Sequence, residues 1–246
     1  MHRFFCEFRN ISLNEIQILD KDEVRHIVSS LRLKINDKVV AIDGHGNEFS
    51  CEISYLDKKK VELKILEKKS IQKEDLYPQI TVACAIPKKS KIDFIVEKLV
   101  ELGASRIILL KTERTEIILK DADKKIERLL GVAKASLKQS GNLFLPEINY
   151  LSFKQLIKFR NEAGFDLALI PNLVNKPIAL KDVLKKDKVK KVLIAIGPEG
   201  DFSKEELGIA IEAGFVPISL GSSVLKVDTA AISAVAFIKL SLEDAR

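Results

Sequence analysis

Apolar and polar positions alternate in short runs over roughly the first 70 residues, with the period of β-strands. The sequence Asp43-Gly44-His45-Gly46-Asn47 lies between two of these runs and predicts a hairpin. One short helix is expected over residues 23–31. The pattern therefore predicts a small, mostly β unit that forms a barrel. Its strands are expected over residues 3–8, 15–19, 38–42, 48–55 and 60–66.

A different period begins near residue 80 and indicates an α/β fold. Residues 81–86 and 106–110 are short apolar runs, and between them the apolar positions recur at helical spacing over residues 92–100. A strand, a helix and a strand in this order predict a parallel βαβ unit. The chain is expected to hold two domains. They cover residues 1–72 and residues 73–246, with the polar segment 68–77 as the link.

Three apolar runs of the second domain are broken by glycine or proline. The breaks are at Pro171-Asn172, at Gly197-Pro198-Glu199-Gly200 and at Gly221. Ligands bind at the carboxyl ends of parallel strands, so these breaks indicate a small-molecule pocket. The alternative interpretation is that they form ordinary tight turns.

The later helices are predicted from their caps and apolar faces. Ser203 stands three residues before Glu206, which predicts a capping box at the start of a helix. Two more helices are expected over residues 121–140 and 153–163. The last helix, over residues 229–242, is apolar almost all round and is expected to be buried on several sides. A subunit interface would supply this burial, which indicates a homodimer.

Composition narrows the possible partners. The 246 residues include 41 Lys and Arg against 35 Asp and Glu, and this net charge of +6 favours an anionic partner, with nucleic acid as the first candidate. The alternative is a surface of ordinary solvated lysines. Cys6, Cys51 and Cys84 lie far apart without a CxxC motif, which predicts neither a disulfide framework nor a metal site and fits the cytoplasm. No apolar run is long enough to span a membrane.

Missing motifs disfavour several enzyme classes. The sequence holds no GxGxxG, GxxxxGK[ST], HExxH or GxSxG pattern. The three histidines, His2, His26 and His45, all precede the α/β part. The residues beside the predicted pocket include several carboxylates, together with Lys226 and Thr229. This set suits a reaction that needs positioning and modest charge stabilisation, not a catalytic triad or a metal centre.

The quoted loops resemble a known family. The second domain resembles the RsmE group of the SPOUT superfamily. The resemblance lies in the sequence IGPEG, the FS and Glu206 that follow it, the later LG, and the Thr229-Ala230 pair in the last helix. The opening MHRFF, His26, Glu113-Arg114 and Gln139-Ser140-Gly141 are also similar. Members of this group are S-adenosylmethionine-dependent methyltransferases that act on a uridine N3 in small-subunit (16S) ribosomal RNA.

The resemblance implies a PUA-like barrel that binds RNA, followed by a SPOUT methyltransferase domain with a parallel sheet and a trefoil knot. It also implies a homodimer, S-adenosylmethionine as cofactor, and ribosomal RNA or the small ribosomal subunit as partner, with no metal and no membrane. RNA is expected to contact Arg3, His26, Arg32, Arg114 and Gln139. Arg114 could instead pair with a neighbouring glutamate. The cofactor is expected to contact Ile170, Pro171, Asn172, Ile196, Gly197, Pro198, Glu199, Gly200, Leu220, Gly221, Ser223, Val224, Leu225 and Thr229.

Several positions depart from the family pattern. Arginine is usual in the family where this chain has Asn142, Ser223 and Lys226, glutamate where it has Asp228, and glycine where it has Asp201. Lysine keeps the charge of arginine but not its bidentate geometry. We therefore expect the RNA contacts to be weakened more than cofactor binding.

Methylation of uracil N3 requires an unpaired base and removal of the N3 proton. Lys226 is predicted to stabilise negative charge on a uracil oxygen, and Asp228 to accept the proton or orient Lys226. Asp228 also stands at a helix start, so capping is an alternative role. Two other functions stay open. One is a non-catalytic RNA-binding homologue, and the other is a SPOUT methyltransferase that acts on another RNA.

Overall fold

The computed structural model describes residues 1–73, 78–87, 91–117, 119–172, 177–184 and 189–243, and the chain divides into two compact units. The smaller unit holds the residues up to 75 together with Lys134–Leu145, and the larger unit holds the others. The boundary that the sequence predicts after residue 72 lies close to this division. The sequence gives no sign that Lys134–Leu145, the end of helix α3 (Ala122–Ser140) and the loop after it, packs with the smaller unit.

The smaller unit is built around one hydrophobic core. Its strands are β1 (Arg3–Phe5), β2 (Glu15–Ile18), β3 (Lys38–Ile42), β4 (Asn47–Leu56) and β5 (Val61–Ser70). Among the described residues they form a five-stranded sheet in the order β1-β3-β4-β5-β2. Each predicted strand is present. The predicted link, residues 68–77, was wrong at its start. β5 continues through Ser70, which still pairs with β4.

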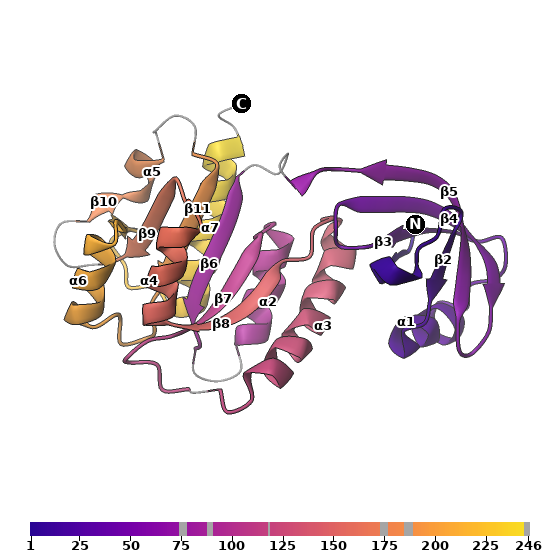
Figure 1. The fold of residues 1–246 in the computed structure, drawn as a ribbon, viewed down its shortest axis with the longest axis horizontal. Coiled ribbons are helices and arrows are strands. Elements are labelled where there is room, and N and C mark those ends of the chain that lie inside the picture. The colour runs from indigo at the N-terminus through magenta and orange to yellow at the C-terminus, as the bar shows by residue number, and fades with distance from the viewer. Residues whose placement is uncertain (74–77, 88–90, 118, 173–176, 185–188, 244–246) are drawn as a thin grey trace. The chain divides into compact units, whose positions relative to one another are not determined.

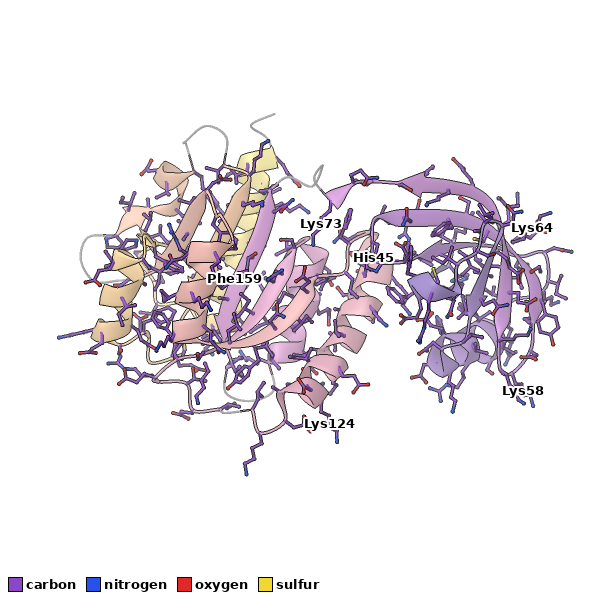
Figure 2. The ribbon with its side chains drawn as sticks, viewed as in Figure 1. His45, Lys58, Lys64, Lys73, Lys124 and Phe159 are labelled. Atoms are coloured by element: carbon purple, nitrogen blue, oxygen red, sulfur yellow. The ribbon has the colours of Figure 1, made fainter. Side chains whose placement is uncertain are left out.

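The predicted hairpin between β3 and β4 is confirmed, and a buried carboxylate organises it. Asp43 is 2% exposed and accepts hydrogen bonds from the backbone N–H groups of His45 (2.8 Å) and Asn47 (3.2 Å). Gly46 has a φ of +94°, and a Cβ there would lie 2.3 Å from the carbonyl oxygen of Ile71, so the close approach of the two chain segments requires glycine. The turn leaves the His45 side chain exposed (Figure 2).

The helix expected over residues 23–31 begins earlier and changes its winding. α1 (Lys21–Arg25) starts after Asp20, whose carboxylate accepts hydrogen bonds from two N–H groups of the first turn. A π-helical turn, η2 (His26–Ser30), continues it. The start at residue 21 follows from this cap, which an apolar pattern alone does not reveal.

The larger unit is a parallel sheet with helices on both faces (Figure 1). In the described part of the chain it has seven strands, in the order β10-β12-β9-β11-β6-β7-β8, and each neighbouring pair among them is parallel. The strands are β6 (Gln79–Ala85), β7 (Arg106–Lys111), β8 (Glu147–Ser152), β9 (Leu167–Pro171), β10 (Ile178–Ala179), β11 (Lys191–Ile196) and β12 (Val216–Ser219). The predicted α/β class and the βαβ unit are confirmed.

Helices cover the two faces of this sheet (Figure 1). They are α2 (Ile92–Glu101), α4 (Phe153–Glu162), α5 (Leu180–Val183), α6 (Lys204–Glu212) and α7 (Val227–Glu243). On one face, Phe153 and Leu156 of α4 and Leu207 of α6 share a core with the strands. On the other face α7 packs against α2, β6 and β11. Burial on both faces explains why β11 is a continuous apolar run.

Some elements were not predicted. β8, β10 and α5 were missed. The capping box of Ser152 and Gln155 at the start of α4, which resembles that of Ser203 and Glu206, was also not recognised. α7 starts at Val227, two residues ahead of the expected start. No helix within the described ranges is long and apolar enough to cross a membrane.

Candidate functional site

The three broken strand ends come together at one edge of the parallel sheet. β12, β9 and β11 are neighbours in this order, and the carboxyl ends of parallel strands lie at the same edge. The loops after them therefore lie side by side. The backbone N–H of Asn172 donates to the carbonyl of Ile218 at 2.9 Å, which ties the ends of β9 and β12 together.

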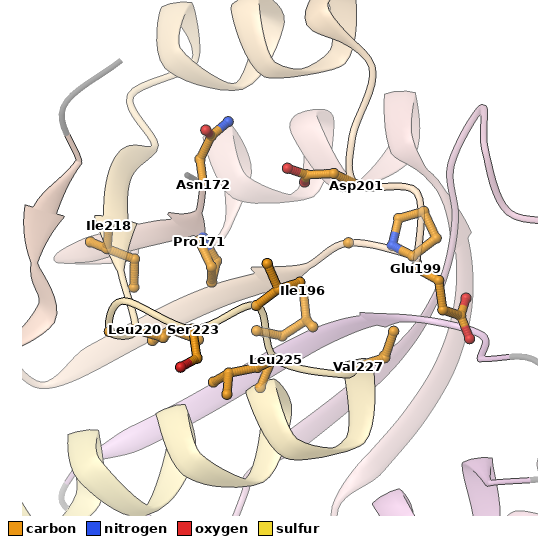
Figure 3. A pocket seen from close by; sticks show the side chains of 15 residues that line it. Pro171, Asn172, Ile196, Glu199, Asp201, Ile218, Leu220, Ser223, Leu225 and Val227 are labelled. Atoms are coloured by element: carbon orange, nitrogen blue, oxygen red, sulfur yellow. The ribbon is translucent and has the colours of Figure 1, made fainter. Parts of the chain in front are cut away.

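A pocket opens between these loops and the start of α7 (Figure 3). All but three of the residues predicted to contact the cofactor line it. The exceptions are Ile170, which is fully buried in the core, Gly200 and Thr229. The pocket walls are formed by Pro171, Asn172, Ile196, Gly197, Pro198, Glu199, Asp201, Ile218, Leu220, Gly221, Ser223, Val224, Leu225, Val227 and Ala230.

The loop after β11 has a fixed shape. The N–H of Asp201 donates to the carbonyl of Pro198 at 2.9 Å and closes a turn. Asp201 has a φ of +59°, and its Oδ1 accepts a hydrogen bond from the N–H of Phe202 at 2.7 Å. The Phe202 ring lies beneath Gly197, where a Cβ would be 3.1 Å from two ring carbons. A side chain at residue 197 would require the loop or the ring to shift by a few tenths of an ångström.

The pocket walls combine apolar surfaces with a few polar groups. Ile196, Leu220 and Leu225 are apolar, whereas Glu199 and Asp201 bring carboxylates (Figure 3). Within the described part of the chain, no cluster of histidine, cysteine or carboxylate side chains could hold a metal ion. Such a pocket suits an organic ligand that has a flat apolar part and a cationic or hydroxyl-bearing part.

An ion pair lies next to the pocket wall at the start of α7. Lys91 Nζ is 2.5 Å from Oδ2 of Asp228, whose side chain is only 16% exposed. The hydrogen bond from Lys91 lowers the pKa of Asp228, although partial burial acts in the opposite direction. Asp228 therefore carries a negative charge at neutral pH, and its place in the first turn of α7 also favours that charge. The neighbouring Val227 lines the pocket.

Lys226 directly precedes α7. Its side chain is exposed and does not line the pocket, while its carbonyl accepts the N–H of Ala230 at 2.8 Å. Among the residues that the structure describes, the cation that contacts Asp228 is Lys91. Since 137 positions separate the two residues, no local motif could have revealed this pair.

Cys84, near the end of β6, is not a candidate nucleophile. It is fully buried, and burial raises the pKa of its thiol to about 12, with the negative charges of Asp228 and Glu199 adding to this effect. A thiol with this pKa stays protonated at neutral pH.

The predicted RNA-contact residues fall in both units. In the smaller unit, Arg3 pairs with Glu48 at 2.9 Å and its guanidinium packs on Gly141, directly after Gln139 and Ser140. This brings Arg3 to the exposed end of α3. His26 and Arg32 are also exposed in this unit. Arg114 lies in the larger unit.

The cofactor contacts predicted from the sequence leave out four residues of the pocket wall. They are Asp201, Ile218, Val227 and Ala230. Asp201 had a usable signal, since it directly follows the broken strand end. Val227 and Ala230 belong to the first turn of α7, which starts earlier than the apolar pattern indicated.

Known proteins similar to this chain cover almost all of its length. Residues 73–239 match a family model described as an RNA methyltransferase domain, and residues 19–66 match one described as an RNA methyltransferase PUA domain. The ribosomal RNA small subunit methyltransferase E of Bacillus subtilis is 28% identical, over 99% of this chain and 98% of its own. The protein of the same name from Synechocystis is 31% identical, over 90% of this chain and 72% of its own.

A solved structure has the same fold. The ribosomal RNA small subunit methyltransferase E of Neisseria gonorrhoeae, bound to S-adenosylmethionine, superposes with a TM-score of 0.82 at 26% identity, over 98% of this chain and 97% of that chain. The likeness includes both units.

Proposed function

We propose, on the premise that this chain belongs to the RNA methyltransferase family, that it methylates a uridine N3 of 16S ribosomal RNA with S-adenosylmethionine as methyl donor. The observation that carries the proposal is the pocket at the ends of three adjacent parallel strands, with the Lys91–Asp228 pair next to its wall. The names of the full-length relatives support the ribosomal substrate.

The pocket fits this cofactor by its chemistry. An adenine needs apolar walls, which Ile196, Leu220 and Leu225 provide. A sugar and a cationic group need acceptors, and Glu199 and Asp201 bring carboxylates to the same walls. Backbone groups at Gly197 and Gly221 can approach a ligand closely because no side chain intervenes. S-adenosylmethionine supplies a methyl group on a positively charged sulfur, which a nitrogen nucleophile can accept.

The residues at the start of α7 would handle the proton of the base. Asp228 is ionised, so it can accept a hydrogen bond from the uracil N3–H and orient the base. Its lowered pKa makes it a weak base, so it would accept the N3 proton only transiently as the N3–CH3 bond forms and would pass it on to solvent. Lys226 is exposed beside it and can face a uracil oxygen that gains negative charge. Asp228 and Lys226 are therefore the proposed catalytic residues.

The smaller unit would hold the RNA. Arg3, His26, Arg32 and Gln139 offer exposed or half-exposed donors, and Arg3 lies beside Gly141, two residues after Gln139. We also propose a homodimer, a trefoil knot around the cofactor pocket and a cytoplasmic location, as the family resemblance implies.

Methyl transfer from labelled S-adenosylmethionine to small ribosomal subunits that lack the modification tests the proposal, with the product nucleoside identified by mass spectrometry. N3-methyluridine is the expected product. Cofactor binding without transfer would favour another RNA substrate. Failure of both would favour a non-catalytic RNA-binding protein.

Asp228→Asn separates the proposed catalytic role from a structural role in the first turn of α7. Asparagine has nearly the shape of aspartate and keeps a side-chain oxygen that can accept a hydrogen bond from Lys91, so the fold should be kept, whereas turnover should fall by at least about tenfold because the negative charge beside the base is lost. Cofactor affinity, measured by calorimetry, should change little. Unchanged turnover would remove Asp228 from the mechanism.

A further inference from the structure

The turn after β7 holds the loop after β11 through two consecutive residues. Arg114 Nη1 donates to the carbonyl oxygen of Gly200 at 2.7 Å and lies 3.5 Å from that of Phe202. The backbone N–H of Glu113 donates to Oε1 of Glu206 at 2.9 Å. These contacts join segments that are 86 to 93 positions apart in the sequence.

The turn after β7 is stabilised by its own hydrogen bonds. Thr112 and Thr115 are buried, with 4% and 8% exposure. The N–H of Thr112 donates to the hydroxyl of Thr115 at 3.0 Å, and the two hydroxyls are 2.8 Å apart. Arg114 therefore projects from a turn whose own shape is fixed by buried hydrogen bonds.

The far end of the loop is anchored independently of Arg114. Glu206 is 7% exposed, and its second oxygen accepts the N–H of Ser203 at 3.1 Å in the capping box of α6. Glu206 thus connects the turn, the loop end and the helix. Removal of the Arg114 side chain leaves this anchor in place, so the α6 end of the loop should keep its position.

Arg114 binds the loop that forms one wall of the pocket, at a residue that does not line the pocket. The loop presents Gly197, Pro198, Glu199 and Asp201 to the pocket, whereas Gly200 does not line it. The carbonyl of Gly200 accepts the hydrogen bond from Arg114 instead. One arginine therefore supports the segment from which the wall residues on either side of Gly200 project.

We propose that Arg114 is a positioning residue for cofactor binding, which acts by fixing the loop of residues 197–202 in its ligand-binding shape. The proposal rests on the proposed function, because it requires the pocket to bind S-adenosylmethionine. It assigns Arg114 a role different from the RNA contact that the sequence suggested. Pre-organisation of a loop raises affinity by lowering the ordering cost at binding.

The test compares Arg114→Ala with Arg114→Lys in the full-length protein. We expect the dissociation constant for S-adenosylmethionine, measured by calorimetry, to rise by about tenfold to a hundredfold in Arg114→Ala, as for loss of a charged hydrogen bond. Arg114→Lys keeps one donor and should give an intermediate value. In methyl transfer to small subunits, KM for the cofactor should rise, while kcat at saturating cofactor and KM for the subunits stay unchanged.

Lys111→Ala is the matched control, since it removes one positive charge from the same end of β7. It should leave cofactor affinity as in the wild type. An Arg114→Ala protein with normal cofactor affinity and weaker RNA binding would overturn the inference and leave the proposed function intact. A drop in melting temperature with both affinities reduced would also overturn it, in favour of a general structural role. A wild-type protein that binds no cofactor would overturn both proposals.

Discussion

Gly197 occupies a position where a side chain has no room. A Cβ would meet two carbons of the buried Phe202 ring at 3.1 Å, so the loop or the ring must move by a few tenths of an ångström. We expect Gly197→Ala to weaken S-adenosylmethionine binding by roughly tenfold, because overpacking costs about 1–3 kcal/mol and here deforms a pocket wall. Calorimetry measures the affinity.

Gly208 provides the matched control for that substitution. It lies in α6, and a Cβ there would meet nothing within 4 Å. Gly208→Ala should leave cofactor binding unchanged and raise the unfolding free energy by up to about 1 kcal/mol, as alanine favours helix. Equal loss of affinity in both variants would contradict the steric explanation.

Asp201 is a residue in the left-handed region, with a φ of +59°. Its carboxylate offsets part of the backbone strain through the 2.7 Å hydrogen bond to the N–H of Phe202. Asp201→Ala should therefore lower the unfolding free energy by more than Asp201→Gly, with a difference of about 1 kcal/mol, because glycine accepts a positive φ without cost. Chemical denaturation of the two variants measures this difference. The reverse order would show that the loop does not keep this conformation.

At the scale of elements, an ion pair joins two helices of the larger unit. Arg128 of α3 donates two hydrogen bonds to the carboxylate of Asp93 on α2. The hydrogen bonds lower the pKa of Asp93, burial opposes the shift, and the charge of Arg128 adds to the lowering. Both side chains are more than a third exposed, so the pair contributes little more than an ordinary surface ion pair.

The pair predicts a stability difference that depends on pH. A carboxyl whose pKa is lower in the folded state stabilises the fold above its unfolded pKa, near about 3.9, and loses this contribution as pH falls through the folded value. Asp93→Asn should thus be less stable than the wild type at pH 6, by up to about 1 kcal/mol. The two should converge as the pH falls through the lowered pKa of Asp93 in the folded state. Urea unfolding at several pH values measures this, and a constant difference would contradict it.

At the scale of the whole molecule, the proposed homodimer finds support on α7. Seven of its 17 residues are buried, yet Phe237 and Leu240 are 43% and 62% exposed in the single chain. They are three residues apart and thus share one face of the helix. An apolar face of this kind is typical of a subunit interface.

Leu240→Glu tests the interface. A charge placed in an apolar contact should shift the protein from dimer to monomer at micromolar concentration, as seen by light scattering. Leu66→Glu is the control, because Leu66 is similarly exposed at 50% but lies on β5 of the other unit. A wild-type protein that is monomeric, or a Leu240→Glu protein that stays dimeric, would exclude this face.

The sequence alone predicted most element types and the position of the pocket. Periodicity, caps and glycine breaks are local signals, set by residues that are close in the chain, and the strand breaks at Pro171, Gly197 and Gly221 are of this kind. The resemblance drawn from these residues is confirmed by the family match over residues 73–239. The missed β8 and β10 are short edge strands with weak apolar patterns, so little local signal marks them.

Only the tertiary structure decided which of these local features meet. The order β12-β9-β11 places three strand ends at one pocket, and no pattern within a strand encodes its neighbours. The Lys91–Asp228 pair and the contact of Arg114 with Gly200 join residues that are 137 and 86 positions apart. The physical reason is that element type depends on neighbouring residues, whereas contacts between elements depend on how the whole chain packs. Local chemistry was thus fixed by the sequence, and the partners of Asp228 and Arg114 by the fold.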